Sequence, residues 1–176
     1  MRSRGVRLLF LAILLVPAHL ALSVAADASG DDALARAVRD RLDRDARLRT
    51  LDLQVDAHDA VVVLRGSVPT LADVLQSRRI ASEVDGVGAV DSQVDLTSRG
   101  RADREIAFDL RDRFQNNGDL AGAGLAVTVR GGAVLLTGSV IDARVRDIAR
   151  RVAASVPGVL GIADEIQAPE DSEASP

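Results

Sequence analysis

The stretch VVVLRGSV at residues 61–68 decides the fold, because it returns as AVLLTGSV at residues 133–140, 72 positions later. Residues 31–94 align with residues 103–166 at this constant offset without a gap, with 19 identities in 64 positions. Self-similarity at one fixed offset indicates that a small module has been duplicated. Two equivalent domains are therefore expected, at residues 30–97 and 101–168.

Each copy opens with the pattern of an amphipathic helix followed by two strands. Leu34, Val38 and Leu42 recur every four residues and form one apolar stripe. Apolar and polar residues then alternate over residues 51–56, as in a half-buried strand, and a turn expected at His58-Asp59 leads into the VVVLRGSV stretch. These two strands are expected to pair as an antiparallel hairpin.

A second helix and a third strand complete each copy. In the first copy Thr70 and Asp73 have the spacing of a capping box at the start of the helix. The third strands are expected at residues 90–96 and 162–168. The predicted order is α-β-β-α-β, an α+β fold in which both helices of a copy pack on one face of a three-stranded mixed sheet.

Four glycines are predicted to be structural positions of the repeat. Gly66 and Gly138 are expected to end the second strand of each copy. Gly86 and Gly158 are expected to stop the second helix and to begin the third strand.

Residues 1–25 form a separate unit with the pattern of a secretory signal peptide. Three arginines precede the apolar run LLFLAILLV at residues 8–16, and small residues follow it. Cleavage is expected after Ala25 or, nearly as well, after Ala26. The alternative is an uncleaved anchor, because residues 8–26 approach the length of a spanning helix. Export from the cytoplasm is expected in either case.

Charge and composition exclude several classes of function. Without residues 1–25 the chain holds 19 Arg and 26 acidic residues, a net charge of −7, whereas a free-standing nucleic-acid binder carries a basic excess. With no Cys and two His, neither a disulfide nor a metal site nor a cofactor is predicted. Because His58 aligns with Arg130, no enzymatic activity and no small-molecule substrate are expected. Residues 169–176 are predicted to form a disordered acidic tail.

Two motifs that occur in both copies carry a resemblance to a known family. A strand ends in Gly-x-Val, at residues 66–68 and 138–140, and a helix ends in Val-x-Gly-Val before another strand, at residues 84–87 and 156–159. In these features the chain resembles the BON domain, present here twice, and is similar to the tandem-BON, osmotically inducible periplasmic members of that family. The absence of Cys argues for a soluble periplasmic member rather than a lipid-anchored one.

The resemblance implies attachment to phospholipid membranes, envelope maintenance and protection against osmotic stress, without catalysis. The expected partner is therefore an anionic phospholipid surface, to which the protein attaches peripherally. The alternative is a protein-interaction or chaperone-like module that holds an envelope protein on a strand edge or open sheet face, without binding lipid.

The first helix of the second copy holds the principal candidate lipid-binding site. Phe108 lies about 200° around the helix from Ile106, off the apolar stripe, and its counterpart in the first copy is Arg36. Arg104 and Arg111 are its neighbours at helical spacing, and Arg101 lies one turn further back. Their guanidinium groups could meet lipid phosphates while the ring enters the headgroup boundary. The alternative is that contact between the two copies covers Phe108.

The later helix of the second copy provides a second candidate surface. Arg144 and Arg151 lie two turns apart on one expected exposed side. Each is expected to attract an anionic headgroup with about 1 kcal/mol.

Overall fold

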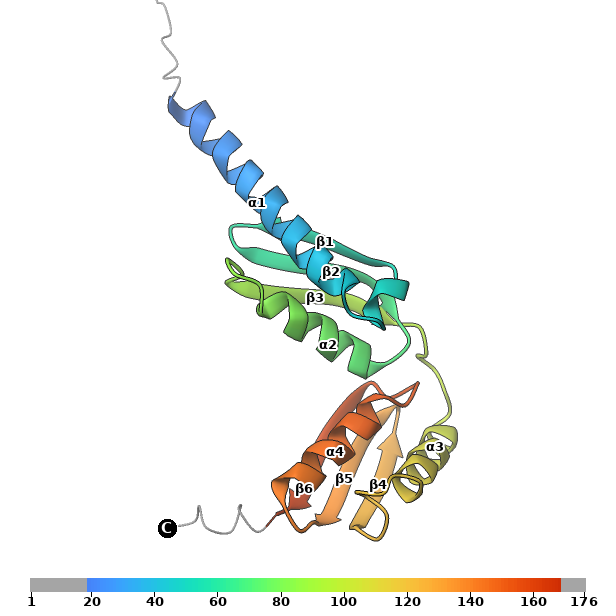
Figure 1. Ribbon diagram of the computed structural model, residues 1–176. Coiled ribbons are helices and arrows are strands. Elements are labelled where there is room, and N and C mark those ends of the chain that lie inside the picture. The colour runs from blue at the N-terminus through green and yellow to red at the C-terminus, as the bar shows by residue number, and fades with distance from the viewer. Residues whose placement is uncertain (1–18, 169–176) are drawn as a thin grey trace, which may run out of the picture.

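The computed structural model describes residues 19–168, with side chains described from Gly30 onward, and both copies fold in the predicted order (Figure 1). The elements of the first copy are α1 (His19–Asp43), the short 3-10 helix η1 (Leu48–Thr50), β1 (Leu53–His58), β2 (Val61–Val68), α2 (Leu71–Ser82) and β3 (Ala89–Leu96). Those of the second copy are α3 (Asp103–Gln115), β4 (Gly124–Arg130), β5 (Ala133–Ser139), α4 (Ala143–Ala154) and β6 (Gly161–Gln167).

Each copy has its own three-stranded sheet. The strand orders are β1-β2-β3 and β4-β5-β6, with the first pair antiparallel and the second pair parallel in both sheets. Equivalent positions have equivalent surroundings: Val62 and Leu64 are buried, as are Val134 and Leu136. The predicted fold of two α+β modules with mixed sheets is therefore confirmed.

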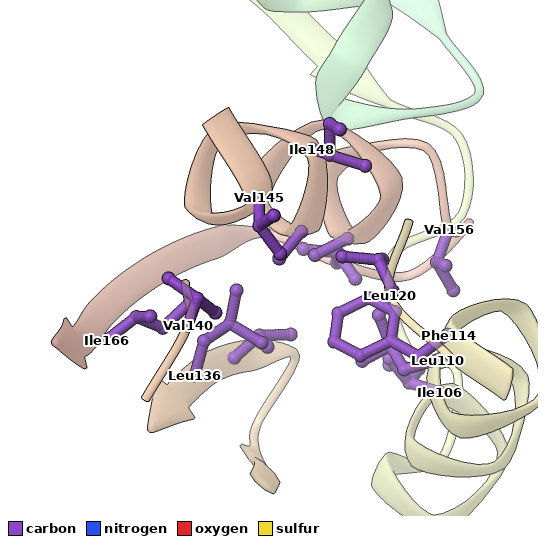
Figure 2. Close-up of a cluster of buried hydrophobic side chains, with 14 of the residues drawn as sticks. Ile106, Leu110, Phe114, Leu120, Leu136, Val140, Val145, Ile148, Val156 and Ile166 are labelled. Carbon is purple, nitrogen blue, oxygen red and sulfur yellow. The ribbon is translucent and has the colours of Figure 1, made fainter. Parts of the chain in front are cut away.

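Both helices of a copy pack on the same face of its sheet. In the first copy Val38 of α1 and Ile80 of α2 lie in one cluster of buried side chains with Leu64 of β2. Figure 2 shows the equivalent cluster of the second copy, into which α3 and α4 both send side chains. The opposite face of the first sheet carries exposed polar side chains, such as Gln54 and Arg65, so water rather than the sister copy covers it.

Gly66 and Gly138 lie inside strands and not at their ends, which corrects the prediction. Their φ angles are +127° and +129°. A Cβ at these positions would collide with the carbonyl oxygens of Asp52 and Gly124, where the neighbouring strand approaches. Only glycine combines this backbone conformation with so close an approach, so each strand continues through its glycine.

The turn of the first hairpin lies one residue later than predicted. His58 is still paired with Val61 as the last residue of β1, and the turn consists of Asp59 and Ala60, with φ angles of +49° and +64°. The second hairpin turn is Gly131-Gly132, with φ angles of +56° and +78°. Two left-handed residues in a two-residue loop match the twist of paired strands, which explains why His58 remains in the strand.

The third strands begin one residue earlier than predicted, and Gly86 and Gly158 precede them as expected. The two glycines have nearly the same φ angles, +93° and +94°. A Cβ on Gly158 would lie 2.9 Å from Cδ1 of Ile106, so the turn after α4 packs against the first turns of α3.

The two copies touch at the start of α2. Leu71, the first residue of α2, packs against the buried cluster of the second copy, whereas the aligned residue in that copy is Ala143. The backbone N–H of Gly158 donates to Oγ of Ser98 over 2.9 Å, and this hydroxyl donates to the carbonyl of Pro69 over 2.8 Å. The copies are thus in contact without sharing a sheet, and α2 faces α4 (Figure 1).

Two predicted segments fall wholly or largely outside the described residues. The structure describes the signal-peptide segment only from His19 onward, and it describes none of residues 169–176. Between residues 19 and 168 we find no helix with the length and hydrophobicity of a membrane span.

Candidate functional site

Phe108 lies on the outer side of α3. Ile106, Leu110 and Phe114 form the inner side and are buried in the core of the second copy (Figure 2). Phe108 is 69% exposed, so contact between the copies does not cover it, and that alternative is wrong. An aromatic ring with this exposure is unusual for a surface position, because the hydrophobic effect favours its removal from water.

Two of the three predicted arginines border this ring. Arg104 and Arg111 lie one turn before and one turn after Phe108, and both are exposed. In the part of the chain that the structure describes, neither guanidinium group has a salt bridge or hydrogen bond. We call Arg104, Phe108 and Arg111 the Phe108 face. It joins an apolar ring to two cations that are free to meet an anion.

Arg101 does not belong to the Phe108 face, contrary to the prediction. Its side chain is 30% exposed, and its Nη1 donates to Oδ2 of Asp109 over 2.9 Å and to the carbonyl of Pro157 over 2.8 Å. Arg101 therefore joins the start of α3 to the turn that precedes β6. Sequence spacing could not reveal this role, because Pro157 lies 56 positions away.

The acidic residues of α3 are not spread evenly around Phe108. At 100° per residue, Arg104 and Arg111 fall on one flank of Phe108, and Glu105 and Asp112 fall on the other. Asp112 accepts a hydrogen bond from Nδ2 of Asn116 over 3.0 Å. The two arginines nearest Phe108 are therefore segregated on one flank, although the helix as a whole holds four acidic residues and three arginines.

Asp103 also lies outside the Phe108 face. Its two carboxylate oxygens accept hydrogen bonds from the backbone N–H groups of Gly131 and Gly132, over 2.8 and 2.9 Å. This carboxylate ties the β4–β5 hairpin turn to the first residue of α3. It acts as a structural anchor at some distance along the helix from the exposed ring.

Arg144 and Arg151 are both exposed, but they line different hollows. Arg144 borders a hollow of about 530 Å³ together with Ile141, which is 83% exposed. Arg151 borders a second hollow, of about 640 Å³, between the two copies. Arg144 and Arg151 therefore do not form the single second surface that the sequence predicts. Sequence reasoning missed Ile141; the signal for it was an aliphatic residue at the position of Pro69 in the first copy.

His58 has the surroundings of a hairpin end. Its side chain is 84% exposed and lies 3.3 Å from a carboxylate oxygen of Asp31 and from one of Asp59. Among the described residues, no group of three or more metal-ligating side chains is assembled.

Comparison with known proteins identifies one family. The model of the BON domain matches residues 30–98 and again residues 102–170. No curated protein is significantly similar in sequence to this chain.

Two solved structures are similar at low identity. Both are of CdsD, described as a structural protein of the type III secretion system of Chlamydia trachomatis, one of them of its C-terminal domain. Identity is 13% and 15%, the matches cover 81% and 77% of this chain and 66% and 65% of those chains, and both TM-scores are 0.31. The chain thus spans slightly less than two thirds of each, and likeness this distant carries no information about function.

Proposed function

Because the chain belongs to the BON domain family, we propose that it is a non-enzymatic protein of the cell envelope that attaches to anionic phospholipid surfaces through the Phe108 face. In this function the protein is exported to the periplasm and serves envelope maintenance or protection under osmotic stress. The partner is the membrane surface itself rather than a small-molecule substrate.

The observation that carries the proposal is the exposed ring of Phe108 beside two arginines that have no salt bridge or hydrogen bond within the described residues. Full burial of a Phe side chain stabilises by about 1.5–3 kcal/mol, and each arginine near an anionic leaflet adds about 1 kcal/mol. The total of about 4 kcal/mol corresponds to a dissociation constant of about 1 mM. Attachment through the Phe108 face is therefore weak, reversible and sensitive to salt, as expected of a peripheral contact.

The segregation of charge on α3 sets the orientation of the proposed contact. With Glu105 and Asp112 on one flank of the ring, that flank is repelled by an anionic surface. The helix would therefore lie with Arg104 and Arg111 turned toward the headgroups. Removal of Arg104 or Arg111 should therefore weaken binding to anionic vesicles. Removal of Glu105 or Asp112 should strengthen it, because the repulsion is lost.

Co-sedimentation with vesicles tests the proposal. The full chain should pellet with vesicles of phosphatidylglycerol at low salt, and much less with vesicles of phosphatidylcholine alone. Phe108→Ala should weaken pelleting about tenfold, equivalent to about 1.4 kcal/mol. Its thermal stability should be unchanged, because the ring makes no contact in the core.

Arg36→Ala is the matched control, because Arg36 holds the position of Phe108 in the first copy and is likewise exposed. This variant should pellet like the unaltered chain. Negligible pelleting with both kinds of vesicle at low salt would contradict the proposal. Suppression of the aggregation of another protein, without vesicle binding, would favour the protein-interaction module instead.

A further inference from the structure

A hollow lies between the two copies, and Phe108 is not among the residues that line it. Its volume is about 640 Å³, and α2 of the first copy and α4 of the second copy form its walls. Figure 1 shows these helices facing each other across the boundary between the copies. The volume lies within the range of about 300–1,000 Å³ that is typical of sites for small molecules. We call this hollow the interdomain cleft.

The interdomain cleft has an apolar lining that comes from both copies. Leu71 and Leu75 of α2 line it from the first copy, and Ile162 of β6 lines it from the second. Leu75 is 49% exposed, which makes it one of four large hydrophobic side chains with high exposure among the described residues. Leu75 belongs to neither buried cluster of the described residues, so packing in a core does not account for it.

Arginines surround this apolar lining. Arg151 has no side-chain partner in the described part of the chain. Arg150 lies 3.5 Å from Asp164 and is more than half exposed, so this pair holds it weakly. Arg79, also more than half exposed, lies 3.3 Å from Glu83 and donates to Oε1 of Gln76 over 3.2 Å. One acidic residue, Asp147, is also among the lining residues. Since Arg47, Arg79 and Arg150 each have an acidic partner outside the lining, Arg151 is the lining arginine best placed to meet an anionic group.

We propose that the interdomain cleft binds a single-chain amphiphile with an anionic head, such as an alkyl carboxylate or alkyl phosphate. The chain of the ligand would lie against Leu71, Leu75 and Ile162, and its head would meet Arg151 with Arg79 or Arg150. Guanidinium groups suit such a head, because they donate two parallel hydrogen bonds to a carboxylate or phosphate. The proposal does not depend on the membrane attachment proposed above, since Phe108 does not line the cleft.

Calorimetric titration of the full chain with dodecanoate and with dodecyl phosphate, each as dispersed monomers, tests the inference. Both should bind with a stoichiometry near one, and dodecyltrimethylammonium, which has the same chain and a cationic head, should not. Arg151→Ala and Leu75→Asn should each weaken binding about tenfold. Both positions are exposed or half-exposed, so these variants should fold.

Arg144→Ala is the matched control, because Arg144 is an exposed arginine of the same helix outside the cleft. It should leave the affinity unchanged, and so should Phe108→Ala. Equal affinity for the cationic amphiphile, or equal loss in Arg144→Ala and Arg151→Ala, would overturn the inference. Loss of monomer binding in Phe108→Ala would also overturn it and would assign the ligand to the Phe108 face.

Discussion

Gly66 and Gly138 are the residues at which one added methyl group would disturb a module most. Both have φ angles near +128°, in the left-handed region that favours glycine. At each position the carbonyl oxygen of the neighbouring strand occupies the place that a Cβ would take. Any side chain therefore has to adopt a strained backbone and displace the strand as well.

Gly138→Ala should lower the free energy of unfolding by more than about 2 kcal/mol, because the cost of a left-handed non-glycine residue is combined with a steric clash. Urea unfolding followed by far-ultraviolet circular dichroism measures this, since the chain lacks Trp and Tyr. Gly118→Ala is the control, because Gly118 has open space around its Cβ position and no positive φ. Equal losses in the two variants would show that the close approach does not constrain the fold.

The structural importance of these two glycines could be predicted, but their position within the strands could not. Their identical placement in both copies marks them as structural. A glycine inside an apolar run is equally compatible with a strand end and with a close approach of two backbones. The carbonyl groups that decide between these possibilities belong to Asp52 and Gly124, 14 residues earlier in the chain.

At the scale of the element, the carboxylate of Asp45 holds the start of η1. Oδ1 of Asp45 accepts hydrogen bonds from the backbone N–H groups of Arg47 and Leu48, over 2.9 and 3.1 Å. Its Oδ2 accepts from Nε2 of Gln76 in α2 over 3.2 Å. The hydrogen bonds from the backbone of Leu48 and Arg47 are the main cause that holds the pKa of Asp45 below its usual value.

Asp45→Ala should destabilise the chain by about 1 kcal/mol at pH 7, as loss of a cap does. Because the folded-state pKa lies below the unfolded one, this stabilisation is fully present above about pH 4 and is lost as the pH falls through the folded-state pKa. The stabilities of variant and parent should therefore converge on acidification, as measured by urea unfolding between pH 3 and pH 7. Asp43→Ala, at an exposed position without a described side-chain bond, should cost less at pH 7. A difference that persists at low pH would contradict the role given to the carboxylate.

The helices α2 and α4 show which features of a helix can be predicted from the sequence. The capping box of Thr70 and Asp73 is confirmed, but the burial of Asp73, 1% exposed, and its 2.7 Å ion pair with Arg47 are long-range features. In the second copy Asp142 caps α4, and Val145 replaces the buried carboxylate. Hydrophobic periodicity predicts both helices. It does not predict the pairing of Asp73 with Arg47, because these residues are 26 positions apart and meet only in the folded chain.

At the scale of the whole molecule, the repeat predicts each core but not the contact between the cores. Residues that are equivalent in both copies, such as Leu48 and Leu120, build the two interiors. The contact depends on Leu71, at a position where the second copy has Ala143, so it lies where the two copies differ. Phe108 is also a position where the two copies differ, because it aligns with Arg36. The periodicity predicts that Phe108 lies off the buried stripe, and in the structure it is exposed.

Leu71→Ala should uncouple the two copies. The substitution gives the first copy the residue found at the equivalent position of the second, and it removes the side chain that packs into the other core. The expected cost is about 1–2 kcal/mol, less than for a fully buried Leu, because Leu71 is half-buried. Nuclear magnetic resonance relaxation of the full chain measures the coupling: the copies should tumble as one body in the parent and with separate, shorter correlation times in the variant.

Leu75→Ala is the control for this measurement, because Leu75 lies one turn further along α2 and joins neither core. It should leave the correlation times equal. Uncoupling should also weaken binding in the interdomain cleft, since that cleft needs walls from both copies. Separate tumbling of the copies already in the parent would show that the Leu71 contact is too weak to join them, and the cleft would then be too short-lived to hold a ligand.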